Sequence, residues 1–211
     1  MVKDCFLCRS FEDRGGMIYK NDKFFIISDI SPLFPNHILF CSNRHEVSFS
    51  EFNPTELNEF YLFIMSVKDK MAKLLNKNLV VFEHGGLHIG CKKVCGTNHA
   101  HLHILPVPIN TNIFTEELDK FIINGTTERF FLKDNITSFP ELSKSNFCYY
   151  LLTIDIDNTI LIYRSHIQFE SQLLRKYISS KFHLVDSYDW EIFHSKNQAL
   201  QTTEFLRNSL F

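Results

Sequence analysis

Short apolar runs alternate with turn residues along the first half of the chain. Asn21-Asp22 separates the first two runs as a hairpin turn, and Ser31-Pro32 precedes the third. Runs of this kind, rich in Ile, Leu, Val and Phe, are typical of strands. The pattern predicts strands over residues 17–20, 24–28, 37–42, 79–83 and 99–105, with Pro106 ending the last one.

One longer segment repeats its apolar residues at helical spacing instead. Asn53 can cap a helix, Pro54 suits the first helical position, and Glu56 can close a capping box. The apolar face consists of Leu57, Phe60, Tyr61, Ile64, Val67, Met71, Leu74 and Leu75. Strands that flank one helix indicate an α+β fold with a mostly antiparallel sheet.

The character of the chain changes near residue 110. Polar connecting stretches dominate up to residue 145 and hold one short helix, over residues 115–122. A hairpin and two helices are then expected, with strands over 149–154 and 159–163 and helices over 170–180 and 197–208. We therefore predict a first domain over residues 1–109 and a small α+β subdomain appended over 110–211.

Composition places the chain among ordinary globular proteins. It has 211 residues, of which 45% are hydrophobic and 22% charged, and its net charge is -2. A chain with this net charge has no excess of positive charge to attract the phosphate backbone, so stable nucleic-acid binding is not expected. No apolar run approaches the roughly 20 residues that span a membrane. The first residues lack a signal-peptide core, which predicts a cytoplasmic protein.

Three histidines in alternation form the sharpest chemical feature, at positions 99, 101 and 103. On a strand they share one face, while the apolar residues between them share the other. A histidine-rich surface tract and a metal site made of histidine alone are the alternatives. We favour a site where neutral imidazoles act as nucleophile, ligand and hydrogen-bond partner.

The spacing His-φ-His-φ-His-φ-φ, where φ is apolar, resembles the signature of the histidine-triad (HIT) superfamily of nucleotide hydrolases and transferases. Other stretches match in the family's order over about residues 5–108. They resemble most the branch of galactose-1-phosphate uridylyltransferase and ATP adenylyltransferase, together with its zinc-bearing bacterial relatives. The matching stretches are Asp29-Ile-Ser-Pro, Pro35-Asn-His37-Ile-Leu, Asn43-Arg-His45, Phe82-Glu-His-Gly85 and Cys95-Gly-Thr-Asn-His99.

The resemblance implies that His101 is the nucleophile. A neutral imidazole would attack the α-phosphorus of a nucleotide and form a covalent nucleotidyl-histidine. The nucleotide is then transferred to a second acceptor. Gly96 and Thr97 would meet the phosphate, with Thr97 among the catalytic residues. His103 would hold or protonate the same phosphate. Because the transferase branch typically has Gln at this third position, His103 favours hydrolysis or phosphorolysis.

The resemblance also implies substrate contacts. Asp29 would accept hydrogen bonds from the ribose hydroxyls, although it can also simply start the turn at Ser31-Pro32. His37 would lie behind the nucleotide or be an ordinary part-buried histidine. His84 stands where the transferase branch has a phosphate-binding Asn, and Asn98 would line the same site.

Cys5 and Cys8 form a Cys-x-x-Cys pair, which is half of a zinc site. The resemblance supplies His45 and His99 as the other two ligands. Such a closed Cys₂His₂ site would be structural and would pin the N-terminus beneath the catalytic strand. Two reduced cysteines in a turn are the alternative, and a redox pair is less favoured because no thioredoxin-like helix follows.

Together these features predict a nucleotide hydrolase for nucleoside-phosphate-X substrates, such as a dinucleoside polyphosphate or a phosphoramidate. A phosphorylase or nucleotidylyltransferase is the alternative, and a zinc-bound nucleotide sensor with slow turnover is another. HIT proteins commonly pair through the long helix and a sheet edge, so a homodimer is one expectation unless residues beyond 110 cover that surface. Gln172 and Arg175 would reach the distal part of the substrate, or belong to a helix that packs through its leucines, which we favour.

Overall fold

The computed structural model describes residues 5–8, 16–86, 99–109, 111, 113–114, 116–122, 125, 127–132, 136–139, 146–184 and 187–211. Within these ranges, no helix combines the length and apolar character that a membrane span requires.

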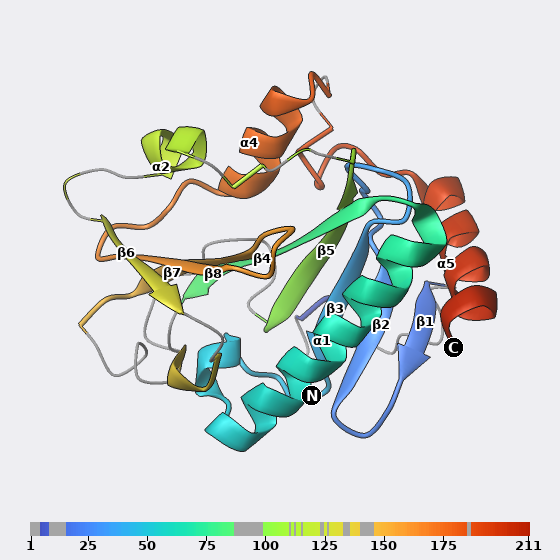
Figure 1. Cartoon of the computed structure of the whole chain (residues 1–211), viewed down its shortest axis with the longest axis horizontal. Helices are drawn as coiled ribbons and strands as arrows, with labels where there is room; N and C mark the ends of the chain where they lie inside the picture. The colour runs from blue at the N-terminus through green and yellow to red at the C-terminus, as the bar shows by residue number, and fades with distance from the viewer. Residues whose placement is uncertain are drawn as a thin grey trace.

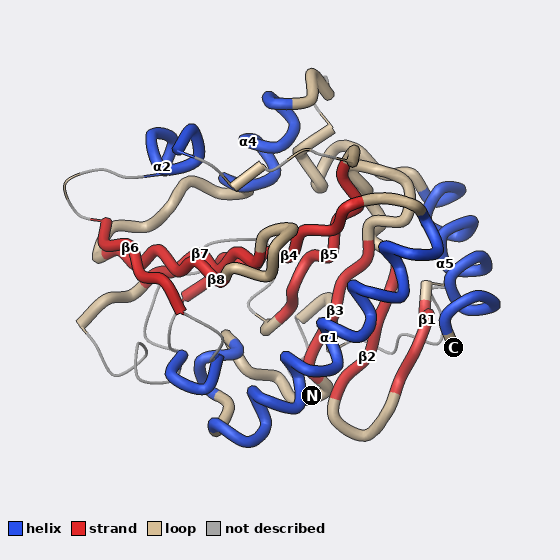
Figure 2. Tube along the Cα trace, in the orientation of Figure 1, coloured by secondary structure: helices blue, strands red, loops and turns tan. Residues whose placement is uncertain are grey.

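In the described part of the chain, eight strands form one sheet whose paired strands are all antiparallel, in the order β1-β2-β3-β5-β4-β7-β8-β6 (Figures 1 and 2). The α+β class expected from the sequence is confirmed. The strands are β1 (Met17–Lys20), β2 (Phe24–Ser28), β3 (Ile38–Ser42), β4 (Asn78–Gly86), β5 (His101–Val107), β6 (Thr127–Leu132), β7 (Tyr149–Ile154) and β8 (Ile160–Ser165).

Two differences from the predicted strands have physical reasons. Pro106 does not end β5 but lies inside it, opposite Leu79 of β4. On its other side β5 pairs with β3 only as far as Ile104, so the missing proline N–H removes no bond from a ladder there. Strand β6 was not predicted at all. It is an edge strand paired only with β8, and without a buried face it shows no alternation of apolar and polar residues.

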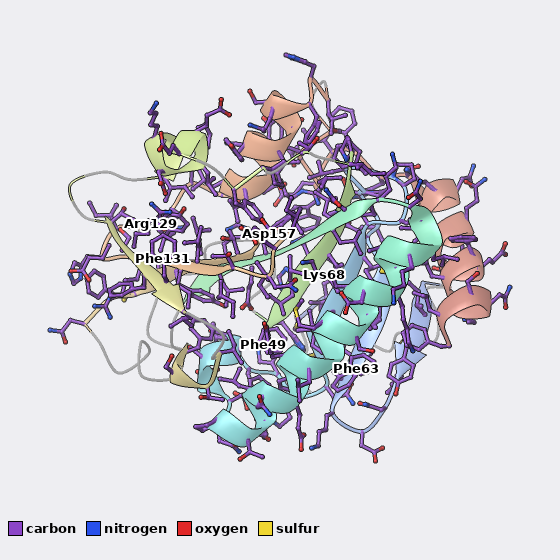
Figure 3. The ribbon with its side chains drawn as sticks, viewed as in Figure 1. Phe49, Phe63, Lys68, Arg129, Phe131 and Asp157 are labelled. Atoms are coloured by element: carbon purple, nitrogen blue, oxygen red, sulfur yellow. The ribbon has the colours of Figure 1, made fainter. Side chains whose placement is uncertain are left out.

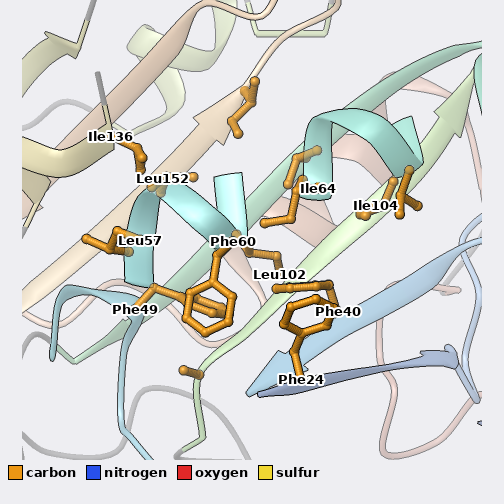
Figure 4. Packing of buried hydrophobic residues seen from close by; sticks show 14 of the residues in the cluster. Phe24, Phe40, Phe49, Leu57, Phe60, Ile64, Leu102, Ile104, Ile136 and Leu152 are labelled. Atoms are coloured by element: carbon orange, nitrogen blue, oxygen red, sulfur yellow. The ribbon is translucent and has the colours of Figure 1, made fainter. Parts of the chain in front are cut away.

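Helix α1 (Pro54–Leu75) lies across one face of the sheet (Figure 1). The Asn53 side chain accepts a hydrogen bond from the Glu56 N–H, and the Glu56 side chain accepts one from the Asn53 N–H, which confirms the predicted capping box. Figure 4 shows how its apolar face packs onto the strands, with Phe60 between Phe49 and Phe40. Each such fully buried side chain stabilises the fold by about 1.5–3 kcal/mol.

The opposite face of the sheet is covered by α2 (Glu116–Ile122) and α4 (Leu173–Lys181) (Figure 1). Helix α5 (Lys196–Leu210) contacts β1, β2 and α1. Short 3₁₀ helices η2 (Phe49–Glu51) and η3 (Ile136–Ser138) lie on the α1 side. The helices near residues 115–122, 170–180 and 197–208 were therefore predicted to within a few residues.

Strands from both sides of residue 110 belong to this one sheet, because β4 pairs with β7 along six residues. Lys68 of α1 adds a polar tie, since its Nζ donates to the Asp155 carbonyl at 2.7 Å and to Asn158 Oδ1. Figure 3 shows Lys68 beside Asp157 in the β7–β8 turn. The division into residues 1–109 and 110–211 stays a prediction.

Candidate active site

Strand β5 places its histidine side chains on the face of the sheet opposite α1. Leu102 and Ile104 of β5 pack into the α1 core, so His101 and His103 point to the other side of the sheet. There they border a cavity of about 60 Å³. Its lining consists of Phe6, Leu7, Asp29, Ile30, Leu39, His84, His101, His103, Gln172, Arg175 and Trp190.

His101 is held in one tautomer by its own strand. Its Nδ1 lies 2.6 Å from the carbonyl oxygen of His99, so Nδ1 carries the proton and donates it to that carbonyl. Burial lowers the pKa of His101, which keeps the ring neutral near pH 7. The Nε2 atom therefore retains its lone pair, as a nucleophile requires.

His37 and His103 form a second chain of hydrogen bonds. The Leu33 N–H donates to His37 Nδ1 at 3.2 Å, so the proton of His37 is on Nε2. That Nε2 lies 3.0 Å from His103 Nδ1 and donates to it. His103 consequently carries its own proton on Nε2. Burial lowers the pKa of His37 to about 4 and holds that of His103 well below its usual range, so both rings are neutral.

Asp29 lies at the end of β2 with both carboxylate oxygens engaged. Its Oδ1 accepts the Ser31 N–H at 2.8 Å, the contact expected of a turn-starting aspartate. Its Oδ2 accepts from Arg175 Nη1 at 2.9 Å. Burial by itself would raise the pKa of Asp29, but His37 and Arg175 hold it well below its usual value. The carboxylate is therefore charged and borders the cavity, while its contact with ribose stays a prediction.

Cys5, Cys8, His45 and His99 come together although they are far apart in sequence, with their ligand atoms within 4.8 Å of one another. His99 Nδ1 lies 3.5 Å from Cys5 Sγ and 3.4 Å from Cys8 Sγ, and His45 Nδ1 lies 3.1 Å from Cys8 Sγ. A tetrahedral zinc separates its sulfur and nitrogen ligands by about 3.6 Å. His99 also donates its Nε2–H to the Ser42 carbonyl at 2.7 Å, which leaves Nδ1 free to bind a metal. The donor set and its spacing thus fit zinc.

Helix α4 contributes more to the cavity than we predicted. Its leucines pack inward as favoured, but Gln172 and Arg175 turn to the cavity and are 7% and 2% exposed. Gln172 accepts from the Trp190 N–H at 3.1 Å and donates to Asp189 at 3.1 Å. Its φ of 60° lies in the left-handed region, which costs a non-glycine residue about 1 kcal/mol. The three-residue spacing of Gln172 and Arg175 is the sequence signal that could have shown their common direction.

The remaining predicted residues divide into two groups. His84 lines the cavity, and burial together with nearby Arg175 lowers its pKa to about 4. Its neighbour Glu83 faces the α1 side instead, as strand alternation requires. Gly96, Thr97 and Asn98 lie outside the described residues.

Several solved structures are similar to part of this chain. One is a hypothetical histidine triad nucleotide-binding protein from Sulfolobus tokodaii, 22% identical over 45% of this chain and 62% of that chain, with a TM-score of 0.38. Another is Plasmodium falciparum diadenosine triphosphate hydrolase, 21% identical over 46% of this chain and 65% of that chain, with a TM-score of 0.36. A third is a Zn-bound histidine triad family protein from Mycobacterium smegmatis, 18% identical over 44% of this chain and 66% of that chain, with a TM-score of 0.34. This chain thus spans less than two thirds of each.

The family-level comparison covers the stretch that holds most of the site. The family model of the HIT domain matches residues 10–108. This range includes Asp29, His37, His84 and all three histidines of the triad. Residues 10–108, just under half of the chain, thus match the HIT domain, in agreement with the resemblance seen in the sequence.

Proposed function

We propose that this protein is a nucleotide hydrolase that cleaves nucleoside-phosphate-X substrates through a covalent nucleotide on His101. The observation that carries the proposal is the tautomer of His101. Its Nδ1–H is committed to the His99 carbonyl at 2.6 Å, so the lone pair of Nε2 is available in the cavity. A neutral, oriented imidazole is the form that attacks phosphorus.

In the first step, His101 Nε2 forms a bond to the α-phosphorus, and the bond from phosphorus to X breaks. X departs with its electron pair and takes a proton from solvent. In the second step, water attacks the same phosphorus and returns a proton to solvent, the P–N bond breaks, and Nε2 regains its lone pair. The products are a nucleoside monophosphate and XH.

His103 is suited to the phosphoryl oxygens. Its Nε2–H is a donor because Nδ1 accepts from His37 at 3.0 Å. A donor aimed at the charge that develops on phosphate stabilises the transition state. Thr97, with Gly96 and Asn98, is proposed for the same phosphate from the resemblance. Asp29 is proposed for the ribose hydroxyls, and His84 for a further contact to phosphate.

Zinc is proposed as the structural metal on Cys5, Cys8, His45 and His99. With four protein ligands it has no open position, so it would hold the N-terminal segment in place and take no part in the chemistry. Its ligand His99 also supplies the carbonyl that orients His101. The site would thus connect metal binding to the geometry of the nucleophile.

Two other functions compete. Phosphate or a sugar phosphate could replace water in the second step, which would make the enzyme a phosphorylase or nucleotidylyltransferase. A slow nucleotide sensor would bind the nucleotide in the same cavity and release no product.

A mass-spectrometric product screen tests the proposal. Wild type, His101→Ala and His166→Ala are incubated with dinucleoside polyphosphates, phosphoramidates and sugar nucleotides, with and without phosphate. His166 is exposed and lies outside the cavity, so His166→Ala is the matched control. We expect nucleoside monophosphate from wild type and control, and a loss of at least about 1,000-fold in His101→Ala.

Each other outcome of the screen is decisive as well. Nucleoside diphosphate formed from a dinucleoside polyphosphate only with added phosphate would make the protein a phosphorylase. Equal turnover in His101→Ala would remove the covalent mechanism. Tight binding without any product would establish the sensor.

A further inference from the structure

Arg175 carries a buried charge that helix packing does not explain. It comes from α4, outside the HIT match, and is only 2% exposed. Its guanidinium crosses to the catalytic sheet and donates to Asp29 Oδ2 at 2.9 Å and to the Ser31 carbonyl at 2.6 Å. A buried charge of this kind costs several kcal/mol unless a partner compensates it.

Asp29 has three candidate cationic partners. Its Oδ2 lies 2.9 Å from Arg175 Nη1, 3.4 Å from His37 Nδ1 and 3.7 Å from His103 Nδ1. If either histidine took the role, it would have to carry a second proton. Arginine stays protonated at every relevant pH, so it can neutralise the carboxylate without any change at the rings.

The remaining contacts of Arg175 fix its position but add no charge. Nε donates to the Tyr188 carbonyl at 2.7 Å, and Nη2 also reaches the Ser187 carbonyl at 3.4 Å. The guanidinium fork therefore joins Asp29 to the turn that follows α4. A lysine ammonium cannot satisfy all these acceptors from one point.

We infer that Arg175 is a positioning residue of the proposed active site: it neutralises Asp29 so that His37 and His103 stay uncharged and keep their tautomers. This assignment deepens the proposed function and, for its catalytic meaning, rests on it. With Arg175 in place, His37 accepts from Leu33 and donates to His103, which leaves the His103 Nε2–H for phosphate. Without Arg175, the carboxylate attracts a proton to His37 Nδ1, which can then no longer accept from Leu33.

The charge balance has to include the titratable and charged groups that the described part of the chain places around Asp29. These come from the β2 end, the segment before β3, β3, β4, β5 and α4, and they are Asp29, His37, Cys41, Glu83, His84, His101, His103 and Arg175. Burial raises the pKa of Cys41 and of Glu83, so both are neutral at pH 7. Asp29 and Arg175 are thus the charged pair of the group.

Long-range ¹H–¹⁵N correlation spectra of the histidine rings test this inference on the full chain without substrate. In wild type we expect His37 to show one protonated and one free nitrogen down to about pH 5. In Arg175→Met we expect the His37 imidazolium to form below about pH 6, a rise of its midpoint from about 4 by roughly two pH units. Lys176→Met, which removes a neighbouring charge on α4 that pairs with Glu170, should give the wild-type pattern.

Two further variants separate charge from simple structural loss. Asp29→Asn/Arg175→Met removes both charges, so His37 should return to the neutral pattern. Arg175→Lys keeps the charge without the fork and should leave His37 neutral. If His37 stays neutral in Arg175→Met, or is charged in Arg175→Lys, the inference is overturned. Should Arg175→Met fail to fold, Arg175→Gln, which removes the charge but keeps hydrogen-bond donors, takes its place with the same expected rise in the His37 midpoint.

Kinetics provide the catalytic readout. We expect kcat/KM of Arg175→Met to fall by about 10–100-fold, the usual effect of losing a residue that orients a ligand. The nuclear magnetic resonance result does not depend on turnover. An enzyme without activity but with the expected His37 shift would therefore count against the proposed function and not against the role of Arg175.

Discussion

At the scale of single residues, the three histidines of one short segment do not share one tautomer, because His101 differs from His99 and His103. His99 carries its proton on Nε2 for the Ser42 carbonyl, His101 on Nδ1 for the His99 carbonyl, and His103 on Nε2 because its Nδ1 accepts from His37. The alternation that puts His101 and His103 on one face is local, so the sequence predicts it. The tautomers depend on carbonyls and rings from other strands, which no spacing rule supplies.

The contact of Arg175 with Asp29 is another feature of the site that the sequence does not predict. It meets Asp29 across 146 positions, and its helix has enough buried leucine and isoleucine to be explained by packing alone. A pattern of apolar residues describes how a helix packs but does not say which polar neighbour it meets. Its role follows only from the distance between two charges.

Glu83 allows a prediction about pH and stability. Burial raises its pKa from 4.5 to about 8, so the folded protein keeps a proton that the unfolded chain releases above pH 4.5. Since the folded state binds more protons in this window, stability falls as pH rises from about 5 to 8, by up to about 1.4 kcal/mol per pH unit. We expect Glu83→Gln, which mimics the protonated form, to flatten this slope in urea unfolding.

The control for Glu83 is an exposed glutamate. Glu204→Gln on α5 removes the same charge at an exposed position and should leave the slope as in wild type. Histidines contribute their own pH dependence, but it is common to all three proteins. A slope in Glu83→Gln as steep as that of wild type would show that Glu83 titrates normally.

At the scale of elements, the sequence predicts best the segments with one buried and one exposed side. Helix α1 has an apolar stripe, a capping box and a proline at its start, and its bounds agree with the pattern. Strand β6 lacks a buried face and was not predicted. Pro106 was predicted to end its strand, because the sequence of β5 does not show that the pairing with β3 ends at Ile104. Such errors arise where pairing, and not local composition, decides the structure.

The proposed zinc site joins three separate segments of the chain, those of Cys5 and Cys8, of His45 and of His99, and gives the next prediction. Purified protein should carry about one zinc per chain. Cys5→Ser/Cys8→Ser should lose the metal and unfold at a lower temperature, since each kcal/mol of lost stability lowers Tm by roughly 2–4 °C in a chain of this size. Cys148→Ser, which changes a cysteine outside the ligand cluster, should keep the metal.

Metal analysis and differential scanning fluorimetry, with and without a chelator, measure both effects. A chelator should lower the Tm of wild type and Cys148→Ser but leave the Tm of the double variant unchanged. Zinc that remains bound in the double variant would exclude Cys5 and Cys8 as its ligands.

At the scale of the whole molecule, the second half of the chain completes structures that the first half begins. Strand β7 covers the edge of β4, and α5 packs against α1 and β1 (Figure 1). Gln172 and Arg175, at the start of α4, line the cavity beside the histidines. The predicted boundary near residue 110 reflects a real change in composition. That change does not reveal which sheet edge the later strands join, because β-pairing partners are set by the complete fold.

The shared sheet predicts that the chain unfolds as one unit. Since β4 and β7 pair along six residues and share the α1 core, neither half keeps its packing when the other is lost. We expect calorimetry to give one transition whose calorimetric and van't Hoff enthalpies agree.

A pair of variants on α5 tests this expectation. Leu206→Ala, at a position fully buried beside the α1 core, should lower the free energy of unfolding by about 2–5 kcal/mol and move the whole transition to lower temperature. Leu200→Ala, 45% exposed on the same helix, should shift it far less. Two separate transitions, with only one of them shifted by Leu206→Ala, would instead show that residues 110–211 form an independent unit whose strands merely extend the sheet.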